Sequence, residues 1–344
     1  MNHNAPLTPR PLDHLSRTRR RILTTRQLRE HGVTASTLAE RCRPGGPWQQ
    51  LLPQVVLLHA GPPTGDERLR AALLYAGCEP GEPGGPDGAD GSDGPVDGQA
   101  MVTGLAALAL HRFSSVPPLL GIDRIDVLVP RQRRLRDAGD VAIHRAHTLP
   151  APQRVTGLPC APVPRALADA VADLDDAGTV RRLLTEAVRG GHCDAAAVVR
   201  ELSRARLLSR PHVVDAVDAL LAEGRALAEG RLYEMVACYG LPDPVWHVDL
   251  RLPGGPSLGG VDAYWPEHAV ALEIDARGPR QDDDALWSQY AQKREHLEGL
   301  GITVVHLTPK KLREALDQQA TVVRTALMAS TDRTPAAYVV VTPS

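Results

Sequence analysis

Apolar and polar residues alternate in the last third of the chain, which is typical of β-strands with one buried face. This pattern predicts strands at 245–252, 259–264 and 269–275, and a mostly apolar segment predicts a fourth strand at 302–307. A helical spacing of apolar residues predicts helices at 225–239, 284–299 and 309–328. The order of these elements predicts an α/β or α+β unit with a crossover helix before its last strand.

The start of the chain shows a helical pattern that begins at Ser16 and is broken at Gly32. Thr34 then offers an N-cap hydroxyl for a second short helix. The segment 48–58 contains the β-type apolar residues of a hairpin or wing. These elements predict a winged helix-turn-helix.

The middle of the chain mixes strands and helices. An apolar helix is predicted at 101–110, and strands are predicted at 125–129 and 141–145. Four helical segments follow, near 164–175, 178–189, 194–207 and 211–223. Between the first domain and this one, Gly, Pro and acidic residues dominate 79–98, and such a composition cannot form a core.

The sequence therefore predicts an α+β protein of several domains, in agreement with its length of 344 residues. The predicted parts are a disordered lead-in at 1–15, a winged helix-turn-helix at 16–76, a flexible acidic insert at 77–100, a mixed α/β and helical middle domain at 101–224, a C-terminal α/β/α domain at 225–330 and a tail at 331–344.

Composition narrows the class of protein. The five cysteines are scattered and include no CxxC pair, which indicates reduced thiols rather than a zinc site or a disulfide framework. The sequence has no apolar stretch of 18 residues and no signal-peptide pattern, so we expect a cytoplasmic protein without a membrane partner. The net charge is −2, yet the segment 16–43 holds eight arginines and two glutamates, a local charge of +6 suited to a polyanion.

Three acidic residues stand out on the predicted C-terminal strands. If residues 265–268 form a hairpin loop and Tyr264 faces Ala269, then Asp262, Glu273 and Asp275 share one face of the sheet. Carboxylates at that spacing can hold magnesium, which activates water and stabilises the leaving oxygen when a phosphodiester is cut. The alternative interpretation is a solvated polar face of a half-buried sheet.

This region resembles the actinobacterial proteins whose C-terminal domain is similar to very-short-patch-repair endonucleases, of the PD-(D/E)XK nuclease superfamily. The resemblance rests on the motifs GLP (240–242), GVDAYWPE (260–267), VALEID (270–275) and GLGITVV (299–305). It implies a restriction-endonuclease-like fold with Asp262 and Glu273 as the motif acids. It also implies that Asp275 replaces the usual lysine and that Glu229 joins the metal ligands.

Two departures from this family leave the activity open. The histidine expected soon after the third strand is missing, and no lysine lies on that strand. All three lysines occur late in the chain, so Lys293 on the next helix is the nearby lysine that could orient water or contact phosphate, or it is a solvated cation beside Arg294. His306 could face the site or be an ordinary partly buried histidine.

The N-terminal segment resembles the winged-helix domain of AbiEi-like antitoxins, through the motifs LTTRQL (23–28), HGV (31–33), WQQLL (48–52) and VVLL (55–58). Such domains bind promoter DNA, with the second helix in the major groove and cations on the phosphates. The alternative is a plain packing or protein-contact unit. The residues expected to contact DNA are Arg17, Arg20, Arg21, Arg26, Thr34, Ser36, Thr37, Arg41 and Arg43.

Together these features predict a DNA-binding protein with a nuclease-like domain, which uses Mg²⁺ if it is an active endonuclease in defence or repair. The competing hypothesis is a non-enzymatic, AbiEi-like antitoxin or transcriptional regulator with a degenerate nuclease fold and a toxin or other protein partner. A third possibility is a nuclease that acts only after a partner or a modified base is recognised.

Overall fold

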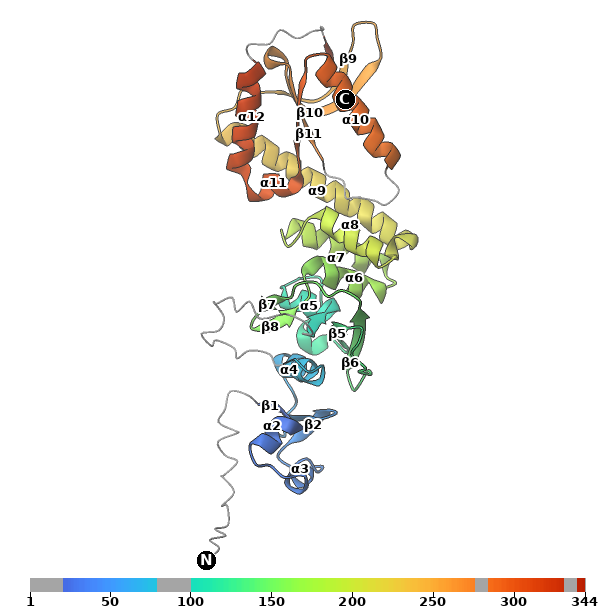
Figure 1. Cartoon of the computed structure of the whole chain (residues 1–344), viewed down its shortest axis with the longest axis vertical. Helices are drawn as coiled ribbons and strands as arrows, with labels where there is room; N and C mark the ends of the chain where they lie inside the picture. The colour runs from blue at the N-terminus through green and yellow to red at the C-terminus, as the bar shows by residue number, and fades with distance from the viewer. Residues whose placement is uncertain (1–20, 79–99, 276–283, 331–338, 344) are drawn as a thin grey trace, which may run out of the picture. The chain divides into compact units, whose positions relative to one another are not determined.

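The structure is a computed structural model that describes residues 21–78, 100–275, 284–330 and 339–343. It mixes helices with three β-sheets, as expected for an α+β protein (Figure 1). The chain forms two compact units, Met1–Leu174 and Asp175–Ser344. The expected lead-in and most of the acidic insert lie outside the described residues.

The chain first forms a small antiparallel sheet with two helices. In chain order the elements are β1 (Ile22–Thr24), α2 (Thr25–Glu30), α3 (Ala35–Arg41), β2 (Gln49–Leu52) and β3 (Val55–Leu57), and the strand order is β1-β3-β2. Residues 22–24 were expected in a helix but form a strand. Helix α2 starts only at Thr25 because Thr24 and Gln27 form a capping box that ends the extended backbone there.

The second sheet of this unit has the order β6-β5-β4-β8-β7. Its elements, with the helices around it, are α4 (Gly65–Tyr75), β4 (Met101–Thr103), α5 (Gly104–Leu110), β5 (Ile125–Pro130), β6 (Val141–Ala146), β7 (Gln153–Val155), β8 (Leu158–Cys160) and α6 (Val163–Ala172). The helix expected over 101–110 is wrong for its first three residues, which pair with β5 as a strand. Strands β7 and β8 were missed because three residues are too short to show a period.

The second unit begins with the helices α7 (Ala177–Arg189), α8 (Ala195–Arg204) and α9 (Pro211–Cys238). The predicted break between helices near Gly224 is wrong, since α9 is a single helix of 28 residues that includes Gly224. A Cβ at Gly224 would lie 3.4 Å from the Ala195 Cβ, so the glycine lets two helices pack closely instead of ending one. Nowhere in the described chain is a helix both long and apolar enough to cross a bilayer.

A five-stranded mixed sheet of order β12-β11-β10-β9-β13 completes the second unit. Its elements are β9 (Val245–Arg251), β10 (Ser257–Trp265), β11 (Val270–Ile274), α10 (Asp284–Gly299), β12 (Thr303–Leu307), α11 (Pro309–Glu314), α12 (Leu316–Ser330) and β13 (Val340–Pro343). Strands β11 and β12 are parallel, with α10 between them in the chain. The predicted helix at 309–328 is two helices separated at Ala315, and part of the predicted tail is strand β13, which pairs with β9.

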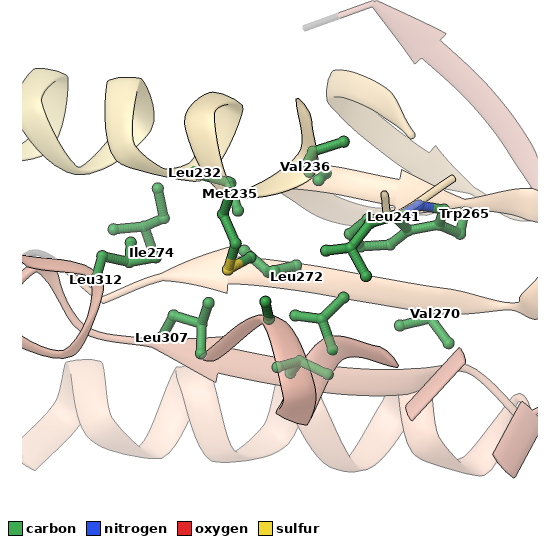
Figure 2. Close-up of a cluster of buried hydrophobic side chains, with 14 of the residues drawn as sticks. Leu232, Met235, Val236, Leu241, Trp265, Val270, Leu272, Ile274, Leu307 and Leu312 are labelled. Carbon is green, nitrogen blue, oxygen red and sulfur yellow. The ribbon is translucent and has the colours of Figure 1, made fainter. Parts of the chain in front are cut away.

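Both faces of this sheet are covered by apolar side chains. On one face Trp265, Leu272 and Ile274 pack against Leu232 and Met235 of α9 (Figure 2). The core on this face also includes residues from α11, α12 and β12, namely Leu307, Leu312, Val323 and Leu327. On the other face Tyr264, Ala271 and Val304 pack with Leu297 of α10. Among the described residues of this sheet, Asp262 is a buried acid that lies within β10 between the two apolar cores.

We predict that Leu272→Ala lowers the free energy of unfolding of the second unit by about 2–5 kcal/mol, because Leu272 is fully buried and truncation leaves a cavity. Urea unfolding followed by tryptophan fluorescence measures the change. The control is Val322→Ala on α12, whose side chain is 48% exposed and which should shift stability by less than about 0.5 kcal/mol. Equal effects of the two changes would contradict the assignment of the core.

Candidate functional site

The hairpin between β10 and β11 sets the positions of the predicted acids. Tyr264 pairs with Ala271 and Trp265 pairs with Val270, so the expected pairing of Tyr264 with Ala269 is wrong by two residues. The connection has the expected four residues but is shifted by one position, because Trp265 still belongs to β10, Pro266–His268 form a 3-10 turn and Ala269 adopts a left-handed conformation with φ 49°. Extended by one step past the last pair, this register places Asp262 opposite Glu273 rather than opposite Ala271.

The Asp262 carboxylate is buried and fully engaged. Its Oδ2 accepts the backbone N–H of Ile274 at 2.6 Å, and its Oδ1 accepts a hydrogen bond from the Arg225 guanidinium on α9. Arg225 also forms an ion pair with Glu229, one helical turn further on, at 2.8 Å. The same cation therefore bridges Asp262 and the helix acid that was predicted to support it.

His247 is a member of this group that sequence reasoning missed. The ligand atoms of Glu229, His247 and Asp262 all lie within 4.8 Å of one another. His247 stands opposite Asp262 in the β9–β10 pairing, and it adopts a left-handed backbone with φ 47°. The pairing register of the predicted strands 245–252 and 259–264 was the signal that could have found it.

At His247 and Asp262, the buried side chains of β9 and β10 switch from one face of the sheet to the other. Val248 and Val261 belong to the core on the α10 side, whereas Trp246 and Ala263 pack with the core on the α9 side. Side chains two residues apart normally share a face, so the irregular residue His247 marks where the alternation is reset. As a result Asp262 reaches the residues of α9.

Tyr233 borders the same group on α9. Its hydroxyl lies 2.5 Å from the Nε2 of His247, and its ring makes an edge contact with Trp246 at 4.5 Å between centroids. Burial raises the pKa of Tyr233, and the negative charges of Glu229 and Asp262 raise it further. Burial is the larger cause, and the two charges add to it because the carboxylates of Glu229 and Asp262 lie near the Tyr233 hydroxyl.

Glu273 has a different set of neighbours. Its carboxylate forms an ion pair with Lys293 of α10, and its Oε2 lies 3.6 Å from Nδ1 of His306. Lys293 also donates to the backbone oxygen of Gly260 at 2.7 Å, and its side chain is only 20% exposed. Lys293 therefore faces the site and is not a solvated cation, and His306 faces Glu273 from the paired position on β12.

The approach of Lys293 depends on a glycine. Gly259 has φ 103°, and a Cβ at that residue would lie 2.8 Å from the Lys293 Cε. The sequence at 259–260 thus leaves room for the lysine to cross β10 and reach Glu273. A larger residue would displace it.

Asp275 follows the end of β11 and is exposed. Its backbone N–H donates to the Leu307 oxygen at 2.8 Å, and the residue lines a cavity together with residues of α7, α8, α9 and α11. Among the described residues, Glu273 and Asp275 both fall outside the Glu229–His247–Asp262 group. The predicted common site for Asp262, Glu273 and Asp275 stays a prediction.

The donor set of the Asp262 group fits a divalent cation. Two carboxylates offer the oxygen ligands that Mg²⁺ prefers, while the imidazole of His247 suits a transition metal such as Mn²⁺. A bound ion would have to displace the Arg225 guanidinium from the two carboxylates. Binding of metal and pairing with Arg225 are therefore competing states of the same acids.

Five of the nine predicted DNA-contact residues lie on α3 or directly beside it. Thr34 is the N-cap of that helix and also bonds the hydroxyls of Ser36 and Thr37, each at 2.9 Å. Arg41 lies over the Trp48 ring at 5.0 Å, and Arg43 is exposed. Arg21 and Arg26 are also exposed, and Arg26 pairs with Glu30 at 3.1 Å. Arg17 and Arg20 lie outside the described residues.

A second polar cluster, in the first unit, was not predicted. Ligand atoms of Asp126, His144 and Asp173 lie within 4.8 Å of one another, and Arg124 pairs with both aspartates. His144 Nε2 lies 2.8 Å from the Asp126 carboxylate. This hydrogen bond raises the pKa of His144 against the opposing effect of burial, and the charges of Asp126, Asp169 and Asp173 raise it further.

Comparison of the sequence with models of known protein families and with curated proteins gives no match.

We predict that Lys293→Met lowers the free energy of unfolding of the second unit by about 1–3 kcal/mol, because it leaves the largely buried Glu273 carboxylate without its cation. Adding Glu273→Gln should recover most of the loss, since neither charge then remains. Urea unfolding of the two single variants and the double variant forms the thermodynamic cycle.

The matched control for this cycle is Arg294→Met, the next residue along α10. Arg294 pairs with Glu298 at the surface, and such pairs contribute under about 1 kcal/mol. Equal losses from Lys293→Met and Arg294→Met, or no recovery in the double variant, would show that Glu273 does not depend on Lys293.

We predict that His144 makes the first unit less stable as pH rises. The folded-state pKa of His144 is raised above its ordinary value of about 6.5, so its contribution is complete below that pH and is lost as pH rises through the folded pKa. Thermal unfolding of the wild type and of His144→Gln across pH 5–9 measures the difference, which should shrink toward high pH.

His147→Gln is the control, because His147 is exposed and outside the Asp126 group. It should leave the pH dependence of the wild type unchanged. A His144→Gln variant with the wild-type pH dependence would mean that the Asp126–His144 hydrogen bond does not influence folding.

Proposed function

We propose that the chain is a DNA-binding protein whose second unit carries a nuclease-like, metal-dependent site for phosphodiester hydrolysis. The observation that supports this proposal most is the group of Glu229, His247 and Asp262, whose ligand atoms lie within 4.8 Å of one another. On the neighbouring strand β11, Glu273 is paired with Lys293 of α10. The order of strands, hairpin and crossover helix agrees with a PD-(D/E)XK fold, which we include in the proposal.

In this proposal Asp262 and Glu229 hold the metal, His247 adds an imidazole ligand, and Glu273 lies at the edge of the site. A bound divalent ion would supply an activated water and stabilise charge on the leaving oxygen. Lys293 lies beside Glu273, and it would hold a phosphate oxygen only by exchanging part of its present pairing with the Glu273 carboxylate and the Gly260 oxygen. Asp275, exposed at the end of β11, is a candidate base or outer ligand.

The N-terminal elements support the DNA-binding part of the proposal. Helices α2 and α3 with the β1-β3-β2 sheet have the composition and order of a winged helix-turn-helix, in which α3 would enter the major groove. Because Thr34 caps α3, its hydroxyl is committed to the helix, which leaves Ser36, Thr37 and Arg43 as better candidates for DNA contacts.

A specific observation favours the rival function, a non-enzymatic antitoxin-like regulator. Asp262 is paired with Arg225 and Glu273 is paired with Lys293, so the acids are neutralised by the protein's own cations. A site of this kind is stable without metal. In the rival, the second unit keeps its fold to bind a partner such as a toxin, and the N-terminal elements bind promoter DNA.

We predict that Mn²⁺ or Mg²⁺ binds the wild type, that Asp262→Asn loses this binding, and that Arg225→Met binds more tightly because the competing guanidinium is removed. Calorimetric titration measures the affinity. Nicking of supercoiled DNA by the full-length wild type should need the same ions and disappear in Asp262→Asn.

Glu267→Gln is the matched control, since Glu267 is an exposed acid in the turn of the same hairpin. It should keep wild-type metal affinity and nicking. Lack of metal binding in both the wild type and Arg225→Met would reject the metal site, and duplex binding without nicking would then support the regulator.

A further inference from the structure

A cavity of about 690 Å³ lies in the second unit between α7, α8, α9 and the start of α11. Its size is in the range of sites for small ligands, about 300–1,000 Å³. Asp275, two residues after Glu273, is one of its lining residues. The cavity thus adjoins the end of β11, where the proposed function places Asp275.

The rim of the cavity is basic. Five cations line it against two acids, Asp194 and Asp275; the cations are Arg189, Arg200, Arg231, Lys310 and Arg313. Within the described part of the chain, the Arg200 side chain makes no ion pair or hydrogen bond. Lys310 reaches only Glu314, at 3.9 Å, and its side chain is 63% exposed. These two cations are therefore available to a ligand.

The floor of the cavity is made of small and apolar residues. Ala195, Ala196 and Ala197 come from the first turn of α8, and Leu227 and Gly230 come from α9. Leu227 is 41% exposed, so its side chain offers apolar surface to a ligand in the cavity. A flat apolar group can approach these residues closely because few side-chain atoms stand in the way.

The start of α8 adds to the positive character of the cavity. Asp194 is the N-cap of α8, but its side chain makes no capping hydrogen bond and instead pairs with Arg313 at 2.7 Å. The acid is thereby neutralised by a neighbouring cation. Asp194 and the first three residues of α8 line the cavity, so the positive end of this helix lies beside the cations already described.

We propose that this cavity binds one or two nucleotides of a nucleic-acid strand, with a base on the alanine and glycine floor and phosphates on Arg200 and Lys310. The proposal rests on the proposed function, since it assigns where the strand lies relative to the nuclease-like site. A nucleotide combines a flat apolar ring with a fixed anion, which matches the floor and the rim together. An acidic protein segment matches only the rim.

The test is binding of a fluorescent single-stranded octathymidylate to the full-length chain in the presence of a chelator. Arg200→Ala with Lys310→Ala should weaken binding at least about tenfold at low salt. It should also lower the slope of log affinity against log salt by about 1.4, since each single-strand phosphate contact contributes about 0.7. Arg200→Lys with Lys310→Arg should keep wild-type binding, which separates the role of charge from an effect on folding.

The matched control is Arg204→Ala with Lys311→Ala, which removes the same charge from the same two helices at residues that do not line the cavity. This double variant should bind within about twofold of the wild type. No binding by the wild type, equal losses in the two alanine variants, or tighter binding of an oligoglutamate of equal charge would overturn the proposal. Because no metal is present, this result is independent of the metal-binding and nicking assays.

Discussion

The pairing of buried acids with the protein's own cations is the constraint on which the second unit depends. Asp262 and Glu273 stand on adjacent strands and each is largely removed from water, so neither carboxylate can remain charged there without a partner. Arg225 neutralises the first from helix α9 and Lys293 neutralises the second from helix α10. The two ion pairs therefore tie helices on opposite faces of the sheet to strands β10 and β11.

This arrangement relates the nuclease-like and regulatory hypotheses to each other. A metal ion and Arg225 would compete for the same oxygens of Asp262 and Glu229. An ion would therefore occupy the site only if its binding outweighed the loss of the two Arg225 ion pairs. His247 favours the metal in this competition, because an imidazole is a good ligand for transition metals. It lies where the alternation of β9 is reset. The chemistry of the site depends on a local irregularity in a strand as well as on its acids.

Much of the fold followed from local sequence. The alternation along β11, the capping threonine of α3 and the helical spacing of α7 each reflect a local pattern that needs no tertiary contact. The errors share one cause. Strands of three residues such as β7, the continuation of α9 through Gly224 and the pairing of β13 with β9 are decided by neighbours distant in sequence.

The sequence by itself determined that β10 and β11 carry the acids Asp262 and Glu273 and that the lysines come late in the chain. Only the tertiary structure decided their partners. The hairpin turn at Pro266–His268 set the register, the left-handed His247 brought an imidazole beside Asp262, and the glycine at 259 admitted Lys293. Contacts of this kind depend on where whole elements pack, and packing is a property of the folded chain that no short window of residues contains.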